Sequence, residues 1–383
     1  MTPLPDPSPE ARAHSERVAA HIRDEIARAG GWIGFARFME LALYAPGLGY
    51  YMAGARKLGA EGDFTTAPEL APLYGHTLAR AAATALAAAD DEILEIGAGT
   101  GALAASLLEE LERLGRLPRR YLIVELSPEL RARSRDTLAA RVPHLMERVA
   151  WLNGLPPAVS GFVIGNEVLD AMPVHVVRAQ ADAIEEAGVA LGASGAFEWA
   201  YRPAVGEVAR AARALALPDG YTTEIGLVAS AFVASLARTI ERGVALFVDY
   251  GFPRREYYHP QRNRGTLMCH YRHRAHDDPF FLPGLQDITA HVDFTAVAEA
   301  ARTAGADVLG YTTQAQLLVN CGLTEVMSRI PAADAKRYLP LAAAANKLTS
   351  PSEMGELFKA IAFGRGVADD PVAFRSGDRR HTL

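Results

Sequence analysis

Residues 92–104, EILEIGAGTGALA, place three glycines between an apolar run and a segment rich in alanine and leucine. The apolar run is typical of a buried strand, and the segment after Gly101 has the composition of a helix. A glycine turn at such a junction exposes backbone N–H groups and the positive end of the helix, and a Cβ there would obstruct a bound molecule. The stretch therefore predicts a loop that binds a dinucleotide, a mononucleotide or a sulfonium cofactor.

Two classes of cofactor fit the spacing of this loop. Gly97, Gly99 and Ala102 meet the dinucleotide pattern G-x-G-x-x-G/A, so a nicotinamide or flavin dinucleotide is one interpretation. Glu95 would repel a pyrophosphate, whereas it is suited to holding the ammonium group of a methionine moiety, directly or through water. Gly101 completes the pattern E-x-G-x-G-x-G. These two features favour S-adenosylmethionine, and a packing turn without a ligand is the third interpretation.

Strand-like and helix-like segments alternate around this loop, which predicts an α/β fold with a parallel, doubly wound sheet. Glu125 ends the strand that follows the loop, at the edge where open α/β sheets bind their ligands. It is therefore a candidate for holding ribose hydroxyls, and an exposed strand end is the alternative. The expected strands are 92–96, 120–125, 149–151, 161–166 and 243–250, and the expected helices are 101–114, 128–138 and 227–242.

The segments outside this alternation predict additions to the sheet. Residues 1–84 are expected to form an extension with helices over 9–29, 34–43 and 71–88 and a glycine- and aromatic-rich loop that is part of the site. The core that contains the parallel sheet is expected to span 85–383. Within it, 174–223 predict an inserted α+β subdomain and 252–290 a loop region, and the tail after Asp369 is expected to be loose.

Composition and charge limit the class of protein. A chain of 383 residues, half of them hydrophobic, is long enough for one large domain or two ordinary ones. The formal net charge of −6 argues against a general nucleic-acid binder. Cys269 and Cys321 lack the spacing of a metal site, and no metal is assigned. Neither a secretory signal pattern nor an uninterrupted apolar run of membrane-spanning length is found, so we expect a soluble cytoplasmic protein.

A second group of polar residues follows the expected strand 161–166. Asn166, Glu167, Asp170 and Pro173 come directly after its apolar residues. Because the carboxyl ends of parallel strands meet at one edge of a sheet, we expect this group beside the glycine loop, where it would position a substrate. The alternative is a helix capped by Asn166, with Asp170 in its solvated first turn.

Together these motifs resemble the MidA-like family of class I S-adenosylmethionine-dependent methyltransferases, which includes a mitochondrial complex I assembly factor that methylates arginine. The resemblance implies a Rossmann-like class I methyltransferase sheet, S-adenosylmethionine as cofactor and a protein substrate, with an arginine of a complex I subunit as the class of target. The matching segments extend over nearly the whole chain: FMELALYAPGLGYY, GDFTTAPEL, LEIGAGTG, GNEVLDAMPV, VDYG, PGLQDITAHVDF, LLVNCGL and MGELFKAIA.

The candidate catalytic residues are acidic side chains and one histidine. Glu167 and Asp170 would hold a guanidinium group bidentately and direct one nitrogen toward the methyl group. His291 would accept the proton after transfer, with Asp293 beside it, and a purely structural histidine is the equal alternative. The candidate cofactor-binding residues are Glu95, Gly97, Gly99, Gly101, Glu125 and Asn166, joined through the resemblance by Asp63 and Pro68 of GDFTTAPEL.

Three functions are open on the sequence alone. The leading hypothesis is a protein arginine N-methyltransferase that acts on a respiratory complex I-type subunit. The others are a methyltransferase for a small molecule or another nucleophile, and an assembly chaperone that binds the cofactor with little turnover. We also expect a protein partner, no nucleic acid, no membrane span and a homodimer.

Overall fold

The computed structural model describes residues 4–53, 66–86, 91–181, 183–367 and 371–383, and the chain divides into two compact units. The first, called here the sheet unit, consists of Thr65–Val168, Phe232–Gly251 and Phe294–Leu383. The second, called the insertion unit, consists of Met1–Phe64, Leu169–Ala231 and Phe252–Asp293. No helix of the described residues is long and apolar enough to cross a membrane.

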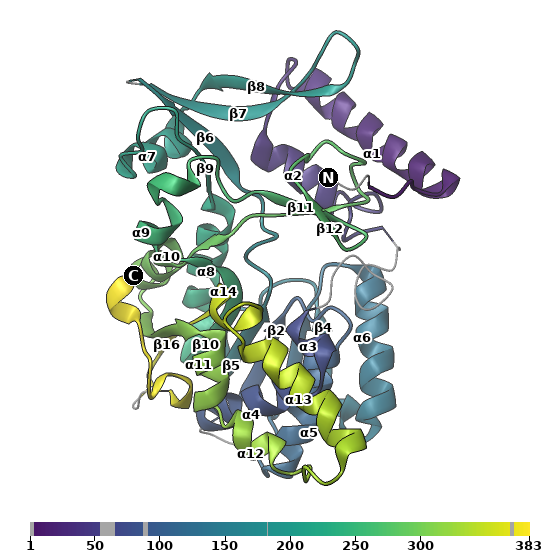
Figure 1. Cartoon of the computed structure of the whole chain (residues 1–383), viewed down its shortest axis with the longest axis vertical. Helices are drawn as coiled ribbons and strands as arrows, with labels where there is room; N and C mark the ends of the chain where they lie inside the picture. Colours follow the sequence, from purple (N-terminus) through teal and green to yellow (C-terminus); the bar gives the residue numbers. More distant parts are fainter. Residues whose placement is uncertain (1–3, 54–65, 87–90, 182, 368–370) are drawn as a thin grey trace. The chain divides into compact units, whose positions relative to one another are not determined.

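The sheet unit is built around a mostly parallel sheet whose strands lie in the order β15-β16-β10-β5-β2-β3-β4 (Figure 1). Both antiparallel pairings on this path involve β16, which runs against β10 and β15. The other neighbours are parallel, so the predicted α/β sheet is confirmed. The strands are β2 (Glu92–Ile96), β3 (Tyr121–Val124), β4 (Val149–Leu152), β5 (Val159–Asn166), β10 (Ile240–Phe252), β15 (Asp307–Thr313) and β16 (Phe358–Arg365).

Helices cover this sheet because its central strands are apolar on both faces. All five residues of β2 are buried, as expected for a parallel strand between two helical layers. The helix that begins after Ser127 is capped by that side chain, which accepts a hydrogen bond from the N–H of Leu130. The helices of this unit are α3 (Ala67–Leu70), α4 (Leu73–Ala85), α5 (Ala102–Arg113), α6 (Pro128–Arg141), α10 (Phe294–Thr303), α11 (Gln314–Asn320), α12 (Leu323–Met327), α13 (Ala335–Thr349) and α14 (Met354–Leu357), and α8 (Leu227–Thr239) directly precedes β10.

The insertion unit contains an antiparallel sheet in the order β1-β7-β6-β9, with β8 paired to β7. The first helix buries Val18, Ile22 and Ile26 at helical spacing. The expected helix at the N-terminus and the expected strands within 174–223 are therefore confirmed. The elements are α1 (Pro9–Arg28), β1 (Ile33–Gly34), α2 (Phe35–Tyr44), β6 (His175–Gln180), β7 (Ala183–Leu191), β8 (Phe197–Pro203), α7 (Gly206–Ala214), β9 (Thr222–Ile225), α9 (Arg254–Tyr257), β11 (Met268–Tyr271), β12 (Arg274–His276), β13 (Asp287–Thr289) and β14 (Val292–Asp293).

Two expectations about irregular segments are wrong. Residues 252–290 are not only a loop, because β11 pairs with both β12 and β13 and buries Cys269 against Ile288. The described part of the tail is not loose, since Phe374 is buried and the N–H of Arg379 donates to the carbonyl of Tyr311 at 2.6 Å. Tertiary contacts order both segments.

The two units divide the chain differently from the expected boundaries of 1–84 and 85–383. The helix α4 packs against α5. The sheet unit therefore begins at Thr65, within the expected N-terminal extension, and its first segment is Thr65–Val168. The strand β7 pairs with β1, so the inserted residues join the N-terminal segment instead of the core.

Candidate functional site

The glycine loop between β2 and α5 has a backbone that other residues adopt only with strain. Gly97, Gly99 and Gly101 have φ values of 68°, 55° and 81°. A Cβ at Gly101 would lie 2.9 Å from the backbone of Ser134, and one at Gly97 would lie 3.2 Å from the side chain of Val168. The backbone conformation thus favours glycine at all three positions, and close packing also disfavours a side chain at Gly97 and Gly101. A tight turn of this kind fits a cofactor that approaches the backbone.

Glu125, directly after β3, is tied to the glycine loop. One carboxylate oxygen accepts from the N–H of Gly99 at 3.0 Å and the other from the N–H of Ser127 at 2.9 Å. Burial raises the pKa of the Glu125 carboxyl, and these N–H groups oppose that rise. The next side chain, Leu126, is 59% exposed. An exposed apolar side chain beside this acidic group offers a surface for a flat ring, and no sequence motif pointed to it.

Glu95 lies within β2 and is almost completely buried. The hydroxyl of Tyr121 donates to its carboxylate at 2.7 Å. Burial raises the pKa of Glu95 to about 7, against the opposing effect of the Tyr121 hydrogen bond, and the charge of Glu125 adds to the rise. Glu95 therefore changes protonation near neutral pH, and its expected contact with an ammonium group stays a prediction.

The end of β5 adjoins the glycine loop. The register pairs Gly165 of β5 with Ile96 of β2, so Asn166 follows beside the start of the loop. The side chain of Asn166 accepts from the hydroxyl of Tyr74 at 2.6 Å and donates to a carboxylate oxygen of Glu167 at 3.0 Å. This bond fixes the Glu167 carboxylate at the carboxyl edge of the sheet, where ligands of α/β folds bind.

The backbone of Glu167 is strained and held in place. Its φ of 53° lies in the left-handed region, which is uncommon for a residue with a side chain. The N–H of Glu167 donates to the carbonyl of Val248 at 2.8 Å, and the N–H of Val168 donates to the carboxylate of the buried Asp249 at 3.1 Å. Strain that the surroundings enforce in this way is common at functional sites.

The short helix α3 contacts both parts of this arrangement. The N–H of Ala67 donates to the Glu167 carboxylate at 3.4 Å, and the hydroxyl of Thr100 in the glycine loop donates to Glu69 at 2.5 Å. Pro68 lies in the first turn of α3, so its segment adjoins the glycine loop, and its contact with the cofactor stays a prediction. The predicted Asp63 lies outside the described residues.

The other predicted residues belong to the insertion unit. Asp170 is buried, and its carbonyl accepts from the N–H of Ala290 at 3.0 Å. The N–H of His291 donates to the hydroxyl of Thr266 at 3.1 Å, and Asp293 forms an ion pair with Arg254 at 3.5 Å. These contacts describe each residue within its unit, and the predicted catalytic roles of all three stay predictions.

The alternative interpretation of Asn166 as a helix cap is wrong. Residues 167–174, all of which the structure describes, form turns and bends and no helix. The side chain of Asn166 bonds to Tyr74 and Glu167 instead.

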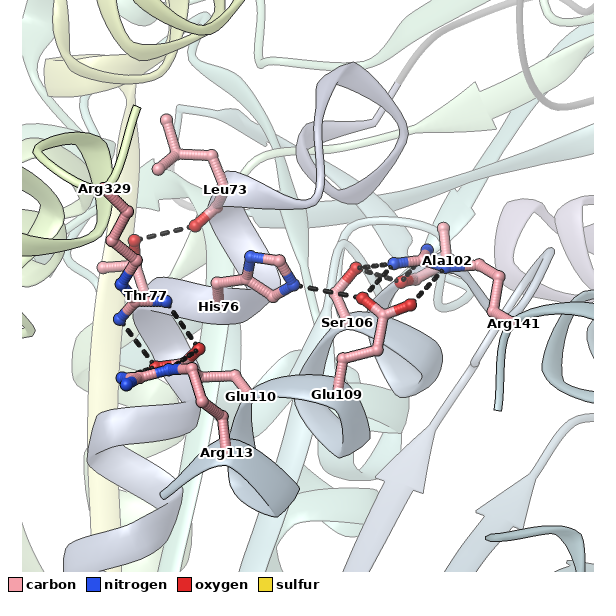
Figure 2. Close-up of polar contacts among 10 residues, drawn as sticks. All are labelled: Leu73, His76, Thr77, Ala102, Ser106, Glu109, Glu110, Arg113, Arg141 and Arg329. Carbon is pink, nitrogen blue, oxygen red and sulfur yellow. Dashed lines mark hydrogen bonds and ion pairs between the residues drawn. The ribbon is translucent and has the colours of Figure 1, made fainter. Parts of the chain in front are cut away.

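A polar network braces the helices next to the glycine loop (Figure 2). Figure 2 shows Glu110 of α5 between Arg113 and Arg329, with N–O distances of 2.7 Å to each. Burial raises the pKa of Glu110, but hydrogen bonds from Arg113 and Arg329 outweigh it and lower the pKa to about 2. The preceding residue, Glu109, accepts from His76 of α4 and from Arg141 at the end of α6. The network fixes α4 and α6 against α5.

Comparisons with known proteins agree with this geometry. A family model described as an S-adenosyl-L-methionine-dependent methyltransferase matches residues 77–312. The protein arginine methyltransferase NDUFAF7 homolog, mitochondrial, of Drosophila melanogaster is 29% identical over 395 residues, which cover 95% of this chain and 88% of that protein. The protein arginine methyltransferase NDUFAF7, mitochondrial, of Danio rerio is 27% identical, with 90% and 86% covered.

A solved structure extends the comparison to the whole chain. The crystal structure of a Burkholderia thailandensis protein bound to S-adenosyl-homocysteine has a TM-score of 0.96 and 55% sequence identity, and the match covers 100% of both chains. S-adenosyl-homocysteine is what S-adenosylmethionine becomes when it gives up its methyl group. The predicted cofactor, S-adenosylmethionine, is thereby confirmed over a dinucleotide, and its contact with the glycine loop stays a prediction. The chain belongs to the family of S-adenosyl-L-methionine-dependent methyltransferases, and S-adenosylmethionine is its cofactor.

Proposed function

We propose that this methyltransferase transfers the methyl group to an arginine side chain of a partner protein. The observation that carries the proposal is the carboxylate of Glu167, which Asn166 and the Ala67 N–H orient at the end of β5 beside the glycine loop. The relatives from Drosophila melanogaster and Danio rerio, both named protein arginine methyltransferases, support the same acceptor.

A fixed carboxylate suits a guanidinium acceptor for two physical reasons. The planar cation pairs with a carboxylate through two parallel N–H···O bonds, which set the direction of its nitrogens. Orientation of reacting groups is worth as much as about 7–11 kcal/mol of the barrier. The pairing also weakens the delocalisation that makes guanidinium a poor nucleophile. Glu167 is therefore the proposed clamp, and Asp170 stays the predicted second carboxylate.

The reaction also needs a base that accepts a proton from the methylated nitrogen. S-adenosylmethionine supplies a methyl group that its sulfonium already activates. A bond forms between the arginine nitrogen and the methyl carbon as the carbon–sulfur bond breaks, and the nitrogen then releases one proton. Glu167 is positioned to take this proton if it holds the guanidinium, and His291 stays the other predicted acceptor.

The family resemblance supports an arginine of a respiratory complex I-type subunit as the acceptor. A cytoplasmic location and a homodimer likewise stay predictions.

Transfer of labelled methyl groups tests the proposal. The purified protein is incubated with methyl-tritiated S-adenosylmethionine and an extract of cells that lack the gene. We expect a labelled protein band that releases methylarginine on hydrolysis. The Glu167→Gln variant should lose this label and keep its affinity for S-adenosylhomocysteine in calorimetry, while Glu207→Gln, a change at an exposed residue of α7, should retain both.

Other results would replace the proposal with one of its alternatives. Label only in small molecules would indicate a small-molecule methyltransferase. Cofactor binding without transfer to any acceptor would favour an assembly chaperone. Full transfer by Glu167→Gln would show that this carboxylate does not hold the substrate.

A further inference from the structure

We infer that Tyr74 is a positioning residue for Glu167 and acts through the side-chain amide of Asn166. The three residues form a chain: the Tyr74 hydroxyl lies 2.6 Å from Oδ1 of Asn166, and Nδ2 of Asn166 lies 3.0 Å from Oε1 of Glu167. Tyr74 is fully buried in α4 and is 93 positions before Glu167 in the sequence. The inference rests on the proposed function of Glu167.

The direction of each hydrogen bond in this chain follows from protonation. Burial, together with the negative charges of Glu167 and Asp249, raises the pKa of Tyr74 well above its ordinary value, so its hydroxyl keeps the proton. A protonated phenol beside an amide oxygen donates to that oxygen. The amide nitrogen of Asn166 must then face Glu167, where it donates to the carboxylate. Tyr74 and the Glu167 carboxylate therefore hold the amide from opposite ends, and Tyr74 fixes the position of the group that donates to Glu167.

Loss of the Tyr74 hydroxyl would remove this control. The two ends of an amide are similar in shape, and a network of partners determines which way it points. Without the phenol, Oδ1 of Asn166 loses the hydrogen bond from Tyr74, so the Asn166 side chain is held less firmly and can move together with the Glu167 carboxylate that it binds. Part of the enzyme would then hold Glu167 in an orientation that does not match the substrate.

Contacts of the first turns of α4 hold Tyr74 in position. His76 donates to the carboxylate of Glu109 at 3.1 Å, and the hydroxyl of Thr77 donates to the carbonyl of Leu73 at 2.7 Å (Figure 2). These neighbours of Tyr74 bind its helix to α5 and close its first turn. The phenol is thus placed by packing and does not need the bond to Asn166 to stay buried.

The test compares Tyr74→Phe with Tyr221→Phe, in the transfer assay with methyl-tritiated S-adenosylmethionine at saturation. Tyr221 is also buried and donates one hydrogen bond, to the carbonyl of His259 at 3.0 Å. The Tyr74 hydroxyl bonds to a neutral amide, and loss of such a bond costs about 0.5–1.5 kcal/mol, which corresponds to a change in rate of up to about tenfold. We expect Tyr74→Phe to lower the transfer rate by up to about tenfold with unchanged affinity for S-adenosylhomocysteine, and Tyr221→Phe to leave both unchanged.

Two further measurements separate positioning from loss of stability. In the Asn166→Ala background, Tyr74→Phe should cause no further loss of rate, because the amide that connects Tyr74 to Glu167 is already absent. The chain contains five asparagines, so selective nitrogen-15 labelling gives few side-chain amide signals. The Asn166 signal should shift or broaden in Tyr74→Phe and not in Tyr221→Phe.

The outcomes distinguish this inference from the proposed function. If Glu167→Gln is inactive while Tyr74→Phe transfers methyl groups as fast as Tyr221→Phe, the positioning role is wrong and the proposed function stands. Equal losses of rate from Tyr74→Phe in the presence and absence of Asn166 would also overturn it. If Glu167→Gln is fully active, the proposed function fails, and the positioning role fails with it.

Discussion

The carboxylate of Asp249 accepts a hydrogen bond from the N–H of Val168 at 3.1 Å and thereby holds the residue that follows Glu167. Asp249 is buried at the end of β10, so the N–H of Val168 would lose its partner if the carboxylate were removed. Val168 is partly buried, and a buried N–H that loses its partner costs about 1–3 kcal/mol. The bond also helps enforce the left-handed backbone of Glu167.

We therefore expect Asp249→Ala to lower the free energy of unfolding by about 2 kcal/mol and to reduce methyl transfer more than tenfold. Asp249→Asn keeps an oxygen that can accept this bond. Its stability and its rate of methyl transfer should therefore lie between those of Asp249→Ala and the wild type. Urea unfolding and the tritium assay measure the two effects. Wild-type transfer by a folded Asp249→Ala protein would show that the Val168 contact does not matter for the site.

The strain at Glu167 makes a separate prediction about glycine and alanine at this position. Both Glu167→Gly and Glu167→Ala remove the carboxylate and should abolish transfer. They differ in backbone preference, because glycine adopts a φ of 53° freely and alanine does not. The glycine variant should be about 1 kcal/mol more stable than the alanine variant. Equal stability in urea unfolding would show that the backbone relaxes when the side chain is lost.

A matched pair of glycines tests the packing of the glycine loop. Gly101 and Gly115 both have positive φ, but a Cβ at Gly101 would lie 2.9 Å from Ser134 whereas one at Gly115 would meet nothing within 4 Å. Gly115→Ala should cost about 1 kcal/mol from backbone strain alone. Gly101→Ala should cost about 1–3 kcal/mol more because α5 and α6 must separate. It should also weaken binding of S-adenosylhomocysteine, which calorimetry measures. Equal effects of the two changes would contradict the packing argument.

The parts of this fold that could be predicted from sequence are those with local signals. The strand β2 and its glycine loop follow from an apolar run and glycine spacing, and Glu125 could be placed because it ends a buried strand. The strands β11 and β13 were missed because each has only three or four residues among prolines and glycines. Their order comes from pairing with each other, which no short stretch of sequence reveals.

Some residues of the candidate site could likewise be predicted from the sequence, and others could not. Glu167 could be found because it follows an apolar strand, as sheet-edge residues do. Tyr74, which bonds to Asn166, and Asp249, which bonds to Val168, lie 93 residues before Glu167 and 82 residues after it. A lone tyrosine in a helical pattern carries no signal of a polar contact. The strained backbone of Glu167 is likewise invisible in the sequence, since glutamate has no preference for positive φ.

The raised pKa of Glu95 predicts how stability depends on pH. Its folded-state pKa of about 7 exceeds the unfolded value of 4.5. The stability that the protonated carboxyl provides is therefore fully present below pH 4.5 and is lost as the pH rises through 7. The difference is about 2.5 pKa units, and each unit corresponds to about 1.4 kcal/mol, so ionisation of Glu95 should cost the fold roughly 3–3.5 kcal/mol.

The isosteric change Glu95→Gln removes this titration and keeps an oxygen that can accept from Tyr121. Relative to the wild type, the variant should gain roughly 3–3.5 kcal/mol of stability between mildly acidic pH and pH 8, as measured by urea unfolding across that range. Glu207→Gln, an exposed change, should show no such gain. If Glu95 also holds the ammonium group of the cofactor, the variant should bind S-adenosylhomocysteine about tenfold more weakly at pH 8, because one charge-assisted bond is lost. Parallel stability curves for Glu95→Gln and the wild type would show that the Glu95 carboxyl is not desolvated in the folded protein.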